Sequence, residues 1–185
     1  ISLIIFLFLF PLVFYNDNKK YNITDALFLI GSVLFLGFSF NLLIIARNYD
    51  LYRIIYLLLL STMTDTFALI TGKLVGKHKL VPKISPNKTI EGCIGGTIGA
   101  IILSIIYTLI CNKIWGLQIN YIYITLISCI LSIVGQIGDL AASSIKRYTE
   151  IKDFSNLIPG HGGMLDRIDS VLFIAPFAYF LLSFL

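Results

Sequence analysis

The sequence predicts an all-α fold: a polytopic membrane bundle of about six transmembrane helices, forming one domain over residues 1–185. Hydrophobic residues make up 57% of the chain and charged residues only 13%, whereas about 25% of the residues in a soluble domain are charged. A chain of 185 residues cannot bury that much apolar surface in one core, so a bilayer is the expected solvent.

The apolar runs of helical length give the expected spans, which are residues 1–15, 24–46, 52–71, 92–112, 119–142 and 170–185. About 20 residues cross a bilayer, so the two shorter terminal runs are expected to tilt or to end at the interface. Within the fourth run, the spacings Gly92/Gly96 and Gly95/Gly99 are typical of close helix packing in lipid.

Basic residues predict the orientation in the membrane. Of the 14 Lys and Arg residues, 11 lie in three alternate loops, at 16–23, 71–91 and 143–169, and the loops 47–53 and 113–118 carry the other three. By the positive-inside rule the first group of loops is cytoplasmic. We therefore expect a plasma or inner membrane protein whose polar site faces the cytoplasm.

One carboxylate, Asp65, lies inside the third span. A charge at that depth costs about 2.5–3.5 kcal/mol on insertion scales, so the side chain is expected to face the bundle interior or a cavity. The alternative is a packing aspartate that is hydrogen-bonded to Thr62 or Thr66.

The loop at 71–91 carries five lysines among glycines and prolines. Pro82 and Pro86 favour extended or turn backbone, and Thr89 with Glu91 is expected to start the next helix. The lysines do not form a helical face, which favours a shaped loop around a polyphosphate over a patch for anionic headgroups. The P-loop pattern is not met.

The segment 138–170 is the densest polar block between apolar spans. Asp139 and Ser143 share a helix face at i, i+4, and Asp166 and Asp169 share one at i, i+3. Paired carboxylates repel unless a cation joins them, and Mg²⁺ prefers such hard oxygen ligands. The pattern predicts Mg²⁺-assisted phosphoryl or nucleotidyl transfer at a membrane surface, with solvated helix-start carboxylates as the alternative.

Other chemistries fit less well. Two histidines without further soft ligands nearby do not favour zinc, and no GxSxG sequence supports a serine hydrolase. Nothing in the sequence indicates a nucleic-acid partner.

These polar motifs resemble the signature of the phosphatidate cytidylyltransferase (CDP-diacylglycerol synthase) family. The matching segments are SSIKR at 143–147, KD at 152–153 and PGHGGMLDRID at 159–169, with GKLVGKHKL at 72–80, ISP at 84–86 and KTIEG at 88–92 upstream. The resemblance covers 55–185, the expected catalytic part, while 1–54 matches only as accessory apolar helices. Leu69 and Ala142 depart from the usual residues. Family members are longer at the N-terminus, so an N-terminally truncated bacterial member is expected.

The resemblance implies transfer of CMP from CTP to phosphatidic acid, giving CDP-diacylglycerol and pyrophosphate. It implies Mg²⁺, with a second mono- or divalent cation, and a homodimer at the level of the family. The implied metal ligands are Asp139, Asp166 and Asp169, and the implied catalytic phosphate-holding residues are Lys146, Arg147 and Arg167. The remaining implied substrate contacts are Asp65, Lys73, Lys77, Ser85, Lys88, Ser143, Lys152, Asp153 and His161.

Three alternatives stay open from the sequence. Two are CTP-dependent enzymes, namely a cytidylyltransferase for an isoprenoid-ether lipid and a polyprenol kinase. The third is a small transporter, favoured by Asp65 and Asp139 within spans. A transporter predicts charges that line a path to both faces, whereas the ionisable residues here gather toward one face.

Overall fold

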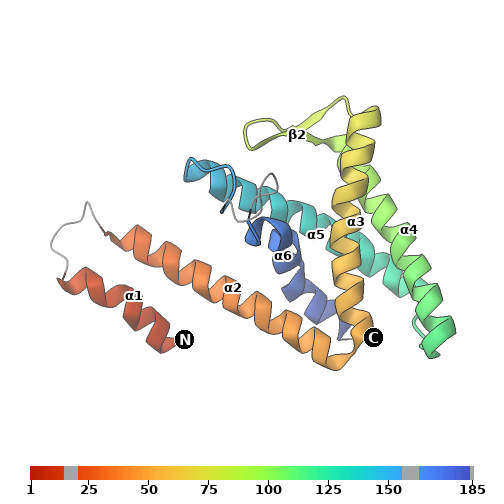
Figure 1. The fold of residues 1–185 in the computed structure, drawn as a ribbon, viewed down its shortest axis with the longest axis horizontal. Helices are drawn as coiled ribbons and strands as arrows, with labels where there is room; N and C mark the ends of the chain where they lie inside the picture. Colours follow the sequence, from red (N-terminus) through yellow and green to blue (C-terminus); the bar gives the residue numbers. More distant parts are fainter. Residues whose placement is uncertain (15–20, 156–162, 184–185) are drawn as a thin grey trace.

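The computed structural model describes residues 1–14, 21–155 and 163–183. Within these residues the chain forms six helices and one two-stranded hairpin (Figure 1). The elements are α1 (Ser2–Phe14), α2 (Ile23–Tyr49), α3 (Leu51–Val75), β1 (Lys79–Val81), β2 (Ser85–Thr89), α4 (Ile90–Trp115), α5 (Tyr121–Tyr148) and α6 (Leu165–Leu182).

The predicted all-α membrane bundle is confirmed. Four helices of the described part, α2 to α5, are long and apolar enough to cross a membrane. The terminal helices are shorter, 13 residues in α1 and 18 in α6, as the two short apolar runs indicated. Each long helix continues a few residues past the C-terminal end of its apolar run. At their N-termini, Asn22, Asp50 and Thr89 cap the first backbone N–H groups of α2, α3 and α4.

Helix α3 packs against α4 along the predicted small-residue stripe. A Cβ atom added at Gly92 would lie 2.7 Å from Ala68 O, and one at Gly96 would lie 2.7 Å from Thr64 O. Only glycine lets the two backbones approach this closely, which is the packing device expected in lipid.

Several buried hydroxyl groups form pairs between neighbouring helices. Tyr56 Oη lies 2.8 Å from Ser128 Oγ, and Ser61 Oγ lies 2.9 Å from Ser170 Oγ. Such pairs are needed because hydrocarbon offers a buried polar group no partner. They join α3 to α5 and α6 and fix the relative positions of the helices that carry the polar residues.

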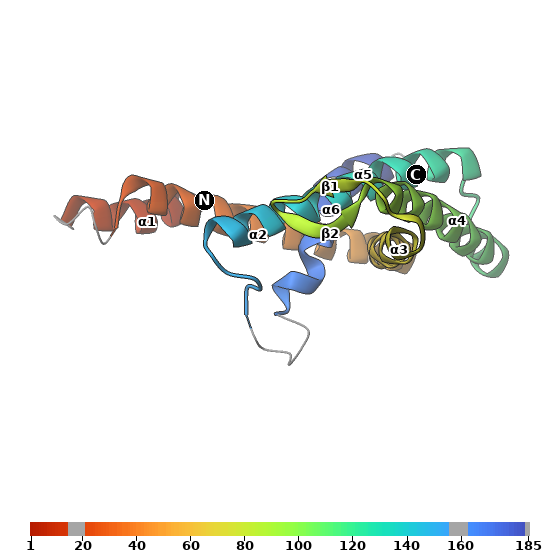
Figure 2. The ribbon, with the colours of Figure 1, turned by 90° about the horizontal axis from the view of Figure 1, so that it is seen from above.

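The segment after α3 differs from the loop that the sequence predicted. Helix α3 continues to Val75, and β1 and β2 then form an antiparallel hairpin before Thr89 caps α4. The start of α4 is confirmed, but the hairpin was not predicted, because its strands have only three and five residues and contain lysines and a proline. Figure 2 shows the hairpin lying across that end of the bundle.

The described parts of two basic loops, 71–91 and 143–169, lie at one end of the molecule. The hairpin and the C-terminal end of α5 lie at the same end, while the α2–α3 corner and the α4–α5 connection lie at the opposite end (Figure 1). The charge asymmetry of the sequence is therefore also an asymmetry of the fold.

Candidate functional site

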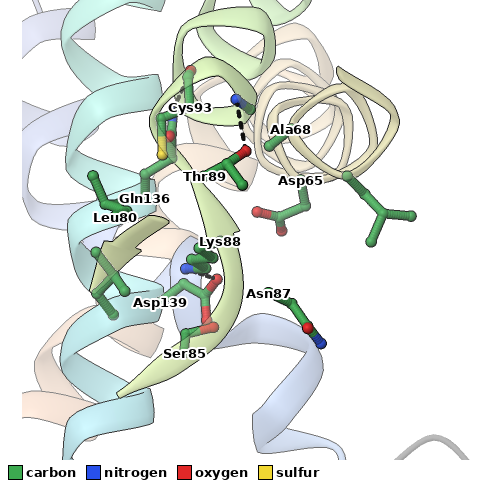
Figure 3. Close-up of a pocket in the computed structure, with 13 residues that line it drawn as sticks. Asp65, Ala68, Leu80, Ser85, Asn87, Lys88, Thr89, Cys93, Gln136 and Asp139 are labelled. Carbon is green, nitrogen blue, oxygen red and sulfur yellow. Dashed lines mark hydrogen bonds and ion pairs between the residues drawn. The ribbon is translucent and has the colours of Figure 1, made fainter. Parts of the chain in front are cut away.

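A cavity of about 280 Å³ opens beneath the hairpin, between α3, α4 and α5 (Figure 3). We call it the hairpin cavity. Its polar lining combines carboxylates, a lysine, amides and hydroxyls, and its apolar lining is small aliphatic. The lining residues are Asp65, Ala68, Leu69, Leu80, Ser85, Asn87, Lys88, Thr89, Gly92, Cys93, Gln136, Asp139 and Leu140.

An ion pair crosses the cavity. Lys88 Nζ from β2 contacts Asp139 Oδ2 from α5, and Ser143 Oγ donates a 3.5 Å hydrogen bond to the other carboxylate oxygen. The side chains of Lys88 and Asp139 remain 24% and 27% exposed. The predicted shared face of Asp139 and Ser143 is confirmed. Both members of the ion pair line the cavity, although Lys88 Nζ itself is covered in this structure.

Asp65 opens onto the same cavity from α3, as Figure 3 shows. The packing alternative is wrong, since Thr62 Oγ1 donates to Leu58 O at 2.8 Å and Thr66 Oγ1 donates to Thr62 O at 2.7 Å. Asp65 and Asp139 both line the cavity, so two carboxylates share it. The cavity therefore places negative protein charge beside a single lysine and favours a cation-bearing ligand.

A second charged group, the α5–α6 anchor, consists of Lys146, Asp166 and Asp169. Lys146 Nζ lies 2.8 Å from Asp166 Oδ1 and 3.8 Å from Asp169 Oδ2. The ammonium also lies 5.1 Å from the centroid of the Phe154 ring. All three charged side chains are nearly buried, with 8–11% exposure.

Every oxygen of Asp166 is already engaged. Oδ1 accepts from Lys146, and Oδ2 accepts from the backbone N–H groups of Phe154 and Gly163, both at 2.9 Å. Burial raises the pKa of the Asp166 carboxyl, but these hydrogen bonds outweigh burial and hold the pKa below its ordinary value. Asp166 therefore ties the segment before α6 to the end of α5.

The fit of a divalent cation follows from these contacts. Among the described residues, no three His, Cys, Asp or Glu side chains are placed to hold a metal by themselves. Asp166 does not fit as a ligand while its oxygens are engaged. Asp139 is engaged only by Lys88 and by one long hydrogen bond of 3.5 Å, and Asp169 by one backbone N–H and the more distant Lys146. These two carboxylates therefore keep acceptor capacity of the kind that Mg²⁺ uses together with substrate phosphates.

Arg147 braces the hairpin in this structure. Its Nε donates to Ile84 O in the hairpin turn and its Nη1 donates to Ile151 O, both at 3.3 Å. On the opposite side, the Glu91 carboxylate accepts from the backbone N–H groups of Lys77 and His78 and contacts His78 Nδ1 at 2.6 Å. These contacts hold the hairpin over the cavity at its turn and at its start.

The structure does not bring every predicted site residue together. Lys73, Lys77, Lys152 and Arg167 are exposed, and Asp153 is half-buried in the segment after α5. None of these five residues lines the hairpin cavity. His161 lies outside the described residues, so its predicted contact stays a prediction.

Three cavity residues were not predicted as ligands: Asn87, Thr89 and Gln136. Asn87 lies between Pro86 and Lys88, which belong to the family motifs, and Thr89 was predicted only as the start of a helix. Gln136 had a detectable signal, because it is a polar residue in an apolar run and lies three residues before Asp139, on the same helix face.

The model of the cytidylyltransferase family matches residues 1–185. The chain belongs to the cytidylyltransferase family. It is 45% identical over 169 residues to the phosphatidate cytidylyltransferase of Bacillus subtilis (strain 168). It is 41% identical over 174 residues to that of Staphylococcus haemolyticus and 39% identical over 174 residues to that of Staphylococcus aureus (strain COL).

Each alignment covers 90% of this chain and 61–62% of the relative. The chain thus spans about three fifths of the length of the curated relatives it matches. The family resemblance read from the polar motifs is confirmed, and it extends over the N-terminal helices as well.

Proposed function

We propose that the chain transfers CMP from CTP to phosphatidic acid and forms CDP-diacylglycerol and pyrophosphate. The observation that carries the proposal is the hairpin cavity, which places Lys88, Asp139 and Asp65 in one pocket at the basic end of a membrane bundle. The printed names of the cytidylyltransferase relatives support the choice of substrates.

The charge distribution around the cavity orients a nucleoside triphosphate. Lys88 is the lysine inside the cavity, and the exposed lysines of the hairpin segment, such as Lys79 and Lys83, lie toward water. The α-phosphate would lie beside Lys88 and the β- and γ-phosphates would point toward the exposed lysines. Pyrophosphate would then leave toward the aqueous side.

A lipid substrate would approach from a neighbouring groove. An apolar groove of about 260 Å³ runs between α2, α5 and α6, and Asp169 is its charged lining residue. Phe28, Phe35 and Phe173 line it as well. Acyl chains in this groove would bring the phosphate of phosphatidic acid to the polar residues of α5 and α6.

The reaction needs no covalent enzyme intermediate. A phosphate oxygen of phosphatidic acid forms a bond to the α-phosphorus of CTP, while the bond from that phosphorus to the bridging α–β oxygen breaks. The bridging oxygen leaves with pyrophosphate. Positioning of the two phosphates and stabilisation of their charge by Lys88 would provide most of the catalysis.

Mg²⁺ belongs to the same proposal. Asp139 and Asp169 would hold it together with the triphosphate, where it would neutralise phosphate charge. Asp166 and Lys146 would act as positioning residues that hold Asp169 and the start of α6 in place. A second cation and a homodimer are further parts of the family-level proposal.

The cytoplasmic orientation is also proposed. The basic end of the bundle carries the hairpin and the cavity, and the positive-inside rule assigns that end to the cytoplasm. CTP would then reach the cavity directly from the aqueous side.

Position-specific labelling of CTP tests the reaction. With phosphatidate present, label in the α-phosphate should enter the lipid, and label in the γ-phosphate should appear in pyrophosphate. A polyprenol-kinase type of reaction would instead carry γ-label into lipid. Absence of α-label in lipid, in protein that is folded and reconstituted with phosphatidate and Mg²⁺, would refute the proposal. Competition by an ether-lipid analogue reports which glycerolipid is preferred.

A further inference from the structure

The side-chain amide of Gln136 has a fixed orientation. Its Nε2 donates to Thr97 Oγ1 at 3.0 Å and to Cys93 O and Ser132 Oγ, both at 3.3 Å. Cys93 O is a carbonyl oxygen and can only accept, so the nitrogen of the amide must face it and the amide cannot be turned over. Thr97 is held in turn, because its hydroxyl donates to Cys93 O.

The other atom of the amide is an unused acceptor. Gln136 Oε1 accepts no hydrogen bond from any residue that the structure describes, and it is not sealed from solvent. Gln136 lines both the hairpin cavity and an apolar groove on the outer side of α4 and α5. Hydrocarbon in that groove cannot donate a hydrogen bond, so the acceptor has a use only in the hairpin cavity.

The position of Gln136 matches the base end of a nucleotide. It lies one helical turn before Asp139 on α5, and therefore farther from the aqueous end than the Lys88–Asp139 ion pair. Figure 3 draws Gln136 beside Cys93, on the side of the cavity away from Ser85. Apolar walls from Ala68, Leu69 and Leu80 complete this end of the cavity. Apolar walls with one oriented polar group are typical of a site for a flat heterocycle.

We infer that Gln136 selects cytosine over uracil by accepting a hydrogen bond from the 4-amino group of the base. This inference rests on the proposed function and adds a specificity-determining residue to it. Uracil carries an oxygen at the same position, and two acceptors facing each other repel and leave both unpaired. A site that hydrogen-bonds one substrate group discriminates strongly against an analogue that lacks it.

The test compares CTP, UTP and the triphosphate of pyrimidin-2-one riboside, which lacks the 4-amino group. The wild type should prefer CTP to both analogues in kcat/KM. Gln136→Leu should reduce each preference at least about tenfold, the value of one hydrogen bond of about 1.4 kcal/mol. The matched control is Gln118→Leu, because Gln118 is exposed in the α4–α5 connection at the far end of the bundle. It should keep the wild-type preferences.

A second variant covers the case in which Gln136→Leu is inactive. Thr97→Val removes the nearest partner of the amide nitrogen and leaves the amide held only by the two longer bonds to Cys93 O and Ser132 Oγ, so it should lower the CTP/UTP preference by a smaller factor. If Gln136→Leu is active and keeps the wild-type preference for CTP over UTP, the inference is wrong while the proposed function stands. If Gln136→Leu is inactive, a wild-type preference in Thr97→Val has the same meaning. A wild type that transfers no CMP would overturn the proposed function and this inference with it.

Discussion

The chain carries two lysine–carboxylate groups only a few helical turns apart. They differ in exposure and in how many hydrogen bonds their polar atoms already make. In the hairpin cavity, Lys88 and Asp139 form a pair that is about one quarter exposed. In the α5–α6 anchor, Lys146 and Asp166 form a pair with 8–10% exposure whose carboxylate also accepts two backbone hydrogen bonds. Lys88 Nζ is covered but makes no hydrogen bond with any residue that the structure describes, so the cavity pair has bonding capacity left for a ligand. Both oxygens of Asp166 already accept hydrogen bonds, so the anchor pair has none to spare without breaking the local fold.

This difference separates binding from positioning. Both groups consist of the same residue types and belong to motifs of the same family resemblance. Burial and hydrogen-bond saturation, rather than residue identity, assign substrate contact to one group and structural support to the other. Substitutions in the cavity pair should therefore reduce activity most, and substitutions in the anchor should reduce stability most.

The largest effect on activity is expected at Asp139. Asp139→Asn should lower kcat/KM for CMP transfer by about 10²–10³, because the cavity loses the partner of Lys88 and a proposed metal ligand. The unfolding midpoint should fall less than in Asp166→Asn, since the two side chains are about one quarter exposed. Asp50→Asn is the matched control, because Asp50 caps α3 at the far end of the bundle and Asn caps equally well. Near-normal activity of Asp139→Asn would contradict the assignment.

The largest effect on stability is expected at Asp166. Asp166→Asn should lower the free energy of unfolding by about 3–5 kcal/mol, because it leaves the buried Lys146 ammonium without its main partner. Thermal unfolding in detergent measures this loss. The double variant Lys146→Met/Asp166→Leu should recover part of it. An Asp166→Asn protein as stable as the wild type would show that the anchor is not structural.

An intermediate effect on activity, seen in the KM for CTP, is expected from substitution of Lys88. Lys88→Met should raise the KM for CTP by about tenfold to a hundredfold, since one charge-assisted contact to phosphate is worth about 1.5–3 kcal/mol. Lys113→Met, at the exposed end of α4, is the control and should leave KM unchanged. Equal KM values in the two variants would reduce Lys88 to a surface charge.

A smaller effect is expected at Arg147, the brace of the hairpin. Arg147→Lys should lower kcat/KM several-fold, because lysine cannot reproduce two diverging N–H donors and each exposed bond is worth about 0.5–1.5 kcal/mol. Hydrogen exchange at the backbone of β2 should become faster. Unchanged exchange there would mean that the 3.3 Å bond from Arg147 Nε to Ile84 O does not hold the hairpin.

The smallest effect is a pH dependence of the anchor. The pKa of Asp166 is lowered in the folded protein, so its contribution to stability is complete above the unfolded value of about 4. The contribution is lost as the pH falls from about 4 through the lower folded value. The stability difference between the wild type and Asp166→Asn should therefore begin to shrink only below about pH 4. Convergence between pH 5 and 7 would contradict the lowered pKa.

The lengths of the apolar runs were sufficient to predict the helical bundle, because an apolar run of about 20 residues in a membrane chain has few stable structures other than a helix. It was also sufficient to place Asp139 and Ser143 on one face. The hairpin was missed because its strands are too short and too polar for an alternating pattern to show. The Lys88–Asp139 pair joins residues 51 positions apart, so only the packing of α3, α4 and α5 brings them together.

The roles within the site could not be separated from the sequence for the same reason. Asp139 and Asp166 both appear as aspartates near a helix end, and only their surroundings differ. Backbone N–H groups from Phe154 and Gly163 saturate Asp166, and no sequence pattern encodes those contacts. The fixed orientation of Gln136 likewise depends on a carbonyl of another helix.

The CTP-induced rise in the unfolding midpoint tests the contrast between the two groups most directly. At a CTP concentration of about 100 times Kd, binding should stabilise the wild type by about 2.7 kcal/mol. Lys88→Met should lose most of this rise at the same CTP concentration. Lys146→Met/Asp166→Leu should keep more of the rise than Lys88→Met, because it leaves Lys88 and Asp139 in place and affects only the positioning of Asp169. A full rise in Lys88→Met together with no rise in the double variant would place the nucleotide at the anchor and contradict the account.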